Sequence, residues 1–211
     1  MMSISDTSLS ITGVKRIHGR AVLSLSSGET LSMPRALLRE RPYKPGMAFD
    51  RKAFEKLMHE RAHLFALEKA ASLLAMRAHT EKEILDALRK NAYPEAAITK
   101  AMAYLQEYGY IDDADFAEKW TSSRTAKGLG TRRIRMELQR KGIASTDIDH
   151  AFEGIDTTQL MAAALKAAEK AARGKDLSIP SDRQKVLAAL ARRGYDFSLA
   201  KQALQGVMKN V

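Results

Sequence analysis

The sequence predicts a mainly α-helical protein, an elongated tandem array of three three-helix repeats behind a small N-terminal β-hairpin or meander. Two observations carry this prediction. β-Forming segments are confined to the first fifty residues, and from Arg51 onward the hydrophobic residues recur with helical spacing. The helical part also repeats itself at intervals of fifty and fifty-two residues, which is typical of a repeat protein.

The N-terminal segment contains three short β-forming stretches, SLSITGVKRI, AVLSLS and ETLSM, with SSGE as a turn between the last two. PRALLRE follows as a short helix that begins at Pro34, and YKPGMAFD follows as a turn. A sheet this small is not stable alone, so we expect it to pack on neighbouring helices. We assign residues 1–60 to this β element and its short helices.

The repeated helix pairs begin at Glu83 (EILDALRKNAYPEAAITKAMAYL), Arg133 (RIRMELQRKGIASTDIDHAFEGI) and Lys185 (KVLAALARRGYDFSLAKQALQGV). A further helix precedes each pair, so we predict three-helix repeats over residues 61–113, 114–156 and 157–211. A small residue stands in the turn between the two helices of each pair: Ala92, Gly142 and Gly194. The aligned apolar columns are Ile84/Ile134/Val186, Leu88/Leu138/Leu190, Tyr93/Ile143/Tyr195, Ala101/Ala151/Ala203, Met102/Phe152/Leu204 and Leu105/Ile155/Val207.

Local signals place the starts of several helices. Thr80 with Glu83, and Ser181 with Gln184, have the spacing of a capping box at the second helix of a repeat. Pro94 stands where a first-turn proline would begin the third helix of the first repeat.

The composition limits the possible functions. The chain has no cysteine, which excludes disulfide scaffolds and thiol nucleophiles. No basic-then-apolar leader and no apolar run of membrane-spanning length is present, so we expect a cytoplasmic protein without a membrane partner. Lys and Arg number 35 against 25 Asp and Glu, a net charge of +10 that favours a polyanionic partner, usually nucleic acid.

Acidic and basic residues are separated along the sequence around the second repeat. Residues 106–118 contain five acids and no base, whereas residues 119–141 contain eight bases and one acid, Glu137. In the helix predicted over 131–141, Ile134 and Leu138 mark the buried side, and Met136 lies among the bases. We predict a contact surface here, and a solvated basic helix is the alternative. The candidate residues are Arg124, Lys127, Arg132, Arg133, Arg135, Met136, Arg140 and Lys141. For Trp120 we favour a half-buried anchor over a base-stacking platform.

The segment from Tyr110 to Ile143, YIDDADFAEKWTSSRTAKGLGTRRIRMELQRKGI, resembles the core motif of the RecX family of regulatory proteins. That motif reads Y-I-D-D-x-x-F-A-x-x-W/Y, then R, a G-x-G turn, R-I-x-x-E-L and K-G-I. The N-terminal ITGVKRI and GETLSMPRALLRERPYKPGMAFD are also similar to the segment that precedes the repeats in longer family members. The resemblance is looser in the third repeat, where Ala200 replaces the Ile98/Ile148 position.

The resemblance implies a non-enzymatic regulator of DNA recombination, DNA repair and the SOS response. Proteins of this family bind the RecA recombinase filament on single-stranded DNA and suppress its ATPase and strand exchange. It therefore implies RecA as the partner, with single-stranded DNA contacted directly or through the filament, and no cofactor. No dimerisation segment is evident in the sequence, so we expect a monomer.

Two other functions fit parts of the sequence. Three-helix units with an arginine-rich helix are also found in sequence-specific helix-turn-helix regulators. His59, Glu60 and His63 spell H-E-x-x-H, a zinc-peptidase pattern, and Glu83 stands where a third ligand could occur. We favour neither, and predict no metal site, because the longer motif match explains more residues and Glu83 has a capping role. The glycines of KGLGTRR precede a helix but follow no strand, which predicts an inter-helix turn instead of a phosphate loop.

Overall fold

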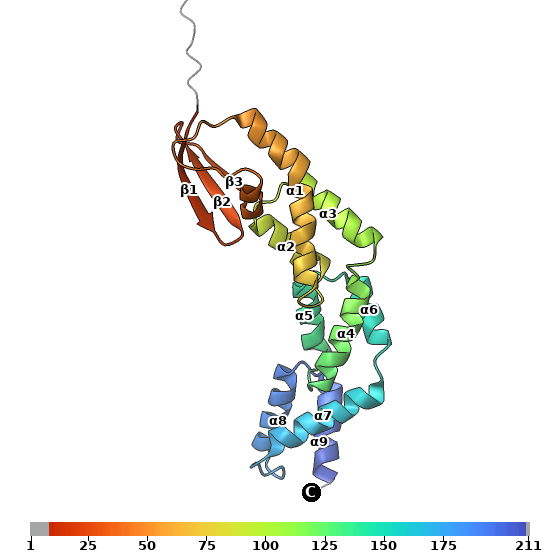
Figure 1. Ribbon diagram of the computed structural model, residues 1–211. Coiled ribbons are helices and arrows are strands. Elements are labelled where there is room, and N and C mark those ends of the chain that lie inside the picture. Colours follow the sequence, from red (N-terminus) through yellow and green to blue (C-terminus); the bar gives the residue numbers. More distant parts are fainter. Residues whose placement is uncertain (1–8, 210–211) are drawn as a thin grey trace, which may run out of the picture. The chain divides into compact units, whose positions relative to one another are not determined.

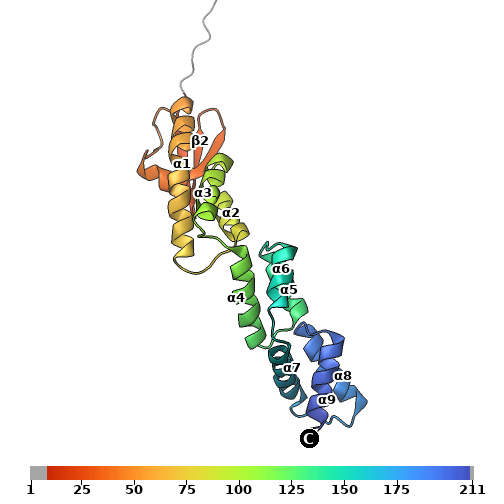
Figure 2. The ribbon, with the colours of Figure 1, turned by 90° about the vertical axis from the view of Figure 1, so that its right-hand side faces the viewer.

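The computed structural model describes residues 9–209, and in that range it contains a three-stranded sheet, one 3-10 helix and nine α-helices (Figures 1 and 2). The chain divides into two compact units, one ending at Ile111 and the other beginning at Asp112. The prediction of a mainly α-helical chain with a small N-terminal sheet is confirmed. Ser8 of the first predicted strand, and the N-terminus expected to lack a leader, fall outside the described residues. No helix in the described range is long and apolar enough to cross a bilayer.

The sheet of the first unit is an antiparallel meander of β1 (Ile11–Ile17), β2 (Arg20–Leu25) and β3 (Thr30–Pro34). The predicted turn joins β2 to β3, and Gly28 there has φ = 85°, a left-handed conformation that glycine adopts without steric cost. Alternate residues of β2, Ala21, Leu23 and Leu25, are buried, so one face of the sheet is apolar. The short helix predicted after Pro34 is the 3-10 helix η1 (Arg35–Arg39).

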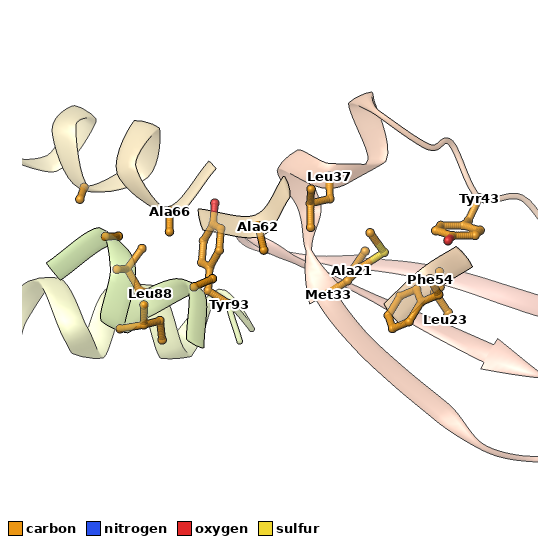
Figure 3. Packing of buried hydrophobic residues seen from close by; sticks show 14 of the residues in the cluster. Ala21, Leu23, Met33, Leu37, Tyr43, Phe54, Ala62, Ala66, Leu88 and Tyr93 are labelled. Atoms are coloured by element: carbon orange, nitrogen blue, oxygen red, sulfur yellow. The ribbon is translucent and has the colours of Figure 1, made fainter. Parts of the chain in front are cut away.

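The first repeat consists of α1 (Arg51–Leu74), α2 (Glu81–Lys90) and α3 (Glu95–Glu107), with α1 packed along α3. It shares one hydrophobic core with the sheet, as expected for a sheet too small to be stable alone. Figure 3 shows Leu23 and Met33 of the sheet in the same cluster as Phe54 of α1 and Leu88 of α2. The sheet is therefore fixed to the first repeat. Helix α1 runs continuously through residue 60, where the sequence places a domain boundary.

The helix starts agree with two of the three sequence signals. Thr80 and Glu83 form the predicted capping box at the start of α2. Pro94 does mark the start of α3, but as its N-cap, one residue before the first turn in which the sequence places it. The capping box predicted at Ser181 and Gln184 is wrong. Helix α8 (Pro180–Arg192) already begins at Pro180, with Ile179 as N-cap, so Ser181 lies inside the first turn. Proline is favoured at the first helical position, so α8 begins at Pro180, before the cap expected at Ser181.

The second unit contains two more three-helix repeats. The middle repeat is α4 (Asp113–Ala126), α5 (Thr131–Arg140) and α6 (Ser145–Glu153), and the third is α7 (Thr157–Ala172), α8 and α9 (Phe197–Lys209). Each repeat has its own hydrophobic cluster. Four of the six aligned columns are buried in all three repeats. Phe152 and Ile155 are only partly buried, because α6 ends at Glu153 and is shorter than α3 and α9.

The corner between the second and third helix of each repeat has a left-handed backbone. The φ angles are 60° at Ala92, 87° at Gly142 and 90° at Gly194. This backbone conformation favours glycine at the corners, which explains Gly142 and Gly194. The first repeat departs from the other two because alanine, unlike glycine, pays a steric cost of about 1 kcal/mol in this region.

Replacing Ala92 with glycine is therefore expected to stabilise the protein. Relief of the left-handed strain exceeds the added entropy of the unfolded chain, for a net gain of about 0.5 kcal/mol in the free energy of unfolding. Urea unfolding of the variant measures this gain. Ala103→Gly, on the exposed side of α3, is the matched control and should lose about 1 kcal/mol. A loss in both variants would show that the Ala92 corner is unstrained.

Candidate functional site

Helix α5 presents an exposed basic surface on a rigid support. Ile134 and Leu138 are fully buried, and the helix packs against α4 and α6. On the opposite side lie Arg132, Arg133, Met136 and Arg140, which we call the basic face; all four are exposed. Their spacing places them on one side of an α-helix. Met136 is 51% exposed between arginines, so a flexible apolar group sits in the middle of the positive surface.

Arg135 does not belong to this surface. Its Nη1 lies 2.6 Å from Asp149 Oδ1 of α6, and its guanidinium lies 5.0 Å from the centre of the Phe152 ring. The other repeats have Leu85 and Leu187 at this position. The middle repeat therefore replaces an apolar packing contact with an ion pair and a cation–π contact to α6.

Arg124 and Lys141 lie against Trp120, which is half-buried as predicted. The Arg124 guanidinium carbon is 4.0 Å, and Lys141 Nζ 4.4 Å, from the centre of the indole. Phe116 stacks on the same ring at 5.5 Å. Because cations and an aromatic ring already surround it, Trp120 acts as an anchor between helices α4 and α5, not as an open platform for a base.

Glu137 connects this cluster to the basic face. Its Oε2 accepts a hydrogen bond from Trp120 Nε1 at 3.2 Å and lies 3.0 Å from Arg124 Nε. Its Oε1 lies 3.5 Å from Arg133 Nε. Glu137, the single acid of residues 119–141, thus neutralises Arg124, the least exposed arginine of that segment. It also orients α5 relative to α4.

Removal of this carboxylate should destabilise the middle repeat. Glu137→Ala leaves the Arg124 side chain, 26% exposed, without its carboxylate, and we expect a loss of about 1–3 kcal/mol in the free energy of unfolding. Trp120 is the only tryptophan, so its fluorescence during urea unfolding reports on this repeat directly. Glu169→Ala on the exposed side of α7 should change stability by less than about 0.5 kcal/mol. Equal effects of the two variants would contradict the bridging role of Glu137.

The glycine turn before α5 is an inter-helix turn, as predicted. Gly130 N–H donates to Arg193 O at 2.9 Å, and Arg132 N–H donates to Gly194 O at 3.0 Å. The amides at the start of α5 are therefore bound to the α8–α9 corner and are not a phosphate cradle. Tyr195 follows this corner; burial raises the pKa of its phenol, although Arg193 opposes the shift. Lys127, the C-cap residue of α4, is exposed beside the turn.

The H-E-x-x-H pattern lies on α1 and gathers no third ligand. Glu83 accepts a hydrogen bond from Thr80 N–H at 3.3 Å and lies 2.9 Å from Arg77 Nη1, so it is held by the helix cap. Among residues 9–209, no three His, Cys, Asp or Glu side chains are grouped to hold a metal ion.

The structure also contains a basic site that no sequence signal indicates. A cavity of about 390 Å³ in the first unit is bordered by His18, Arg35, Arg39 and Lys69. Its members come from four separate segments between residues 18 and 93, so no local charge run marks it.

Comparison with known protein families assigns the three helical repeats. Residues 66–105 match the first three-helix domain of RecX, residues 112–151 the second, and residues 158–204 the third. A "Regulatory protein RecX" from Mycolicibacterium vanbaalenii is 34% identical over 146 residues, covering 65% of this chain and 79% of the relative. The chain belongs to the RecX family. The resemblance found in the core motif is thereby confirmed.

Other RecX proteins extend the match. "Regulatory protein RecX" from Clostridium botulinum is 28% identical over 198 residues, 92% of each chain. A "Crystal structure of regulatory protein RecX" superimposes with a TM-score of 0.64 at 21% identity, covering 92% of this chain and 98% of that one. At this identity the similarity supports the fold alone. The three RecX domain matches begin at residue 66, so the sheet and the first part of α1 lie outside them.

Proposed function

We propose that this RecX-family chain is a non-enzymatic cytoplasmic regulator of recombination, DNA repair and the SOS response, which binds RecA and its filament on single-stranded DNA. Bound there as a monomer, it lowers ATP hydrolysis and strand exchange. Family membership supports a regulatory role, and the basic face is the observation that carries the mode of binding. Three exposed guanidiniums on one helix can contact phosphates or acidic protein groups, and Met136 adds an adaptable apolar contact.

Of the eight candidate residues, five project into solvent: Lys127, Arg132, Arg133, Met136 and Arg140. We propose that these five make the direct contacts. Arg124, Arg135 and Lys141 contribute by holding α5 in place, because each already contacts an aromatic ring within the repeat.

The alternative of a sequence-specific helix-turn-helix regulator is less compatible with this geometry. Recognition helices enter the major groove with their N-terminal residues. The N-terminal amides of α5 donate to the α8–α9 corner, so the third repeat occupies the space in front of that end. We therefore expect no preference among random duplex sequences in a binding selection.

The direct test titrates the protein into RecA filaments on single-stranded DNA and follows ATP hydrolysis. We expect turnover to slow at less than one protein per RecA, and the protein alone to hydrolyse no ATP. Sedimentation of the free protein should give a monomer. Unchanged RecA turnover at a large molar excess would refute the proposal.

A further inference from the structure

The basic cavity of the first unit is a second candidate binding site. It lies where the β1–β2 turn, η1, α1 and the α2–α3 corner meet, and its volume is about 390 Å³. The groups that border it and carry the argument are His18, Arg35, Arg39, Lys69, Asn91 and Tyr93. They belong to one compact unit with a continuous core, so their positions relative to one another are fixed.

The walls of this cavity are built by close contacts. A Cβ on Gly19 would lie 1.7 Å from Asn91 Oδ1, so the β1–β2 turn packs directly on the Asn91 side chain, which would have to move for any larger residue. Asn91 Nδ2 donates to Ala87 O at 2.8 Å, and Arg35 Nη1 donates to His18 O at 3.3 Å. The Asn91 bond fixes that side chain within the α2–α3 corner, and the Arg35 bond joins η1 to the β1–β2 turn, 17 residues away in sequence.

Tyr93 closes the cavity on the side of α1. Its hydroxyl donates to Phe65 O at 2.9 Å, and Figure 3 shows its ring between the α2–α3 corner and α1. Burial, together with the negative charge of Glu68, raises the pKa of Tyr93 to about 12.

Backbone strain is concentrated at the same place. Within residues 9–209, only two non-glycine residues have a positive φ: His18 at 48° and Ala92 at 60°. His18 borders the cavity, and Ala92 lies between Asn91 and Tyr93. The Ala92 conformation is the helix corner common to all three repeats, so only the strain at His18 is specific to this cavity. Strained backbone tends to be retained at binding sites.

The charge of the cavity is positive. No carboxylate borders it. Arg39 is compensated, since its Nη2 donates to both oxygens of Glu68 at 3.0 and 2.9 Å. In the described part of the chain, Arg35 and Lys69 have no such ion pair. Arg20 and Lys90, which are next to Gly19 and Asn91 in sequence, are also exposed.

We propose that this cavity binds the phosphodiester backbone of single-stranded nucleic acid, with Arg35 and Lys69 as its direct phosphate ligands. A guanidinium and an ammonium in a cavity without carboxylates match the phosphate oxygens. The flanking bases favour a polymer over a free ion. This proposal rests on the proposed function and gives the N-terminal segment a role in it, because the β1–β2 turn and η1 supply two of the cavity walls.

The test compares an Arg35→Gln, Lys69→Gln double variant with wild type for binding to a labelled oligothymidylate at several salt concentrations. Loss of two phosphate contacts should lower the log–log salt slope by about 1.4, twice the single-strand increment, and reduce low-salt affinity about tenfold. Lys44→Gln, Lys52→Gln is the matched control, because it removes the same charge from exposed positions of the same unit away from the cavity. Its affinity should fall less than about twofold.

A measurement on the wild-type protein keeps the proposal testable even if the double variant unfolds. Oligothymidylate should protect Lys69 from amine acylation and leave Lys52 reactive. Protection by inorganic pyrophosphate alone would instead assign a free polyphosphate and overturn the proposal. Normal oligonucleotide binding by a folded variant would also overturn it, and weakened RecA binding alone would point to an acidic protein partner. The proposed function fails separately, when wild type leaves RecA turnover unchanged.

Discussion

A variant with Arg132, Arg133 and Arg140 all changed to Ala is expected to inhibit RecA filaments at least about tenfold less than wild type while keeping its fold. The loss corresponds to about 1.4 kcal/mol of binding free energy, which is less than three charge-assisted contacts can contribute together. The fold should survive because these side chains are exposed and the core residues Ile134 and Leu138 are unchanged. The half-inhibitory concentration in the ATPase assay measures the effect, and circular dichroism checks the fold.

The matched control is a Lys166, Lys170 and Lys201→Ala variant, which removes three exposed charges from α7 and α9 of the same unit. If the basic face contacts phosphates, each lost arginine should flatten the salt dependence of single-strand binding by about 0.7 in log–log slope. If it contacts acidic groups of RecA, binding to naked DNA should hardly change while filament binding falls. Equal losses in variant and control would mean that net charge, and not the face of α5, determines inhibition.

The repeated apolar pattern predicts most of the fold because the spacing of apolar residues determines which side of each helix faces the core. Ile84, Ile134 and Val186 occupy equivalent buried positions, as the internal alignment requires. The failures have local causes. Pro180 displaces the expected cap at Ser181, and the early end of α6 leaves Ile155 partly exposed.

The site is less predictable, since a helical wheel shows which side a residue faces but not what it contacts. The wheel places Arg132, Arg133 and Arg140 correctly in solvent. It gives no indication that Asp149 on another helix binds Arg135. A helical wheel also cannot predict the cavity near Lys69, because the four segments that line this cavity are brought together only by tertiary folding.

Gly194→Ala is expected to destabilise the second unit by about 3 kcal/mol, the largest effect of any single substitution considered. Gly194 has φ = 90°, where a side chain is strained by about 1 kcal/mol or more. Its new Cβ would lie 2.4 Å from both N and Cβ of Arg133, an overlap that costs about 1–3 kcal/mol even after relaxation. The α8–α9 corner must then move away from α5, which breaks the bonds that cap the start of that helix.

Gly130→Ala should disrupt the same contact between the start of α5 and the α8–α9 corner, from the α5 side. Its Cβ would lie 2.2 Å from Tyr195 N, and backbone atoms cannot move aside as a flexible side chain can. Gly154→Ala is the control, since no atom lies within 4 Å of the added Cβ and φ is −77°, so stability should change by less than about 0.5 kcal/mol. Urea unfolding followed by Trp120 fluorescence and by circular dichroism measures all three variants. Both junction variants should also inhibit RecA more weakly, because Arg132 and Arg133 stand on the turn of α5 that the junction holds. Wild-type stability in Gly130→Ala and Gly194→Ala would mean that the two repeats are not joined at this corner, and the support proposed for the basic face would be lost.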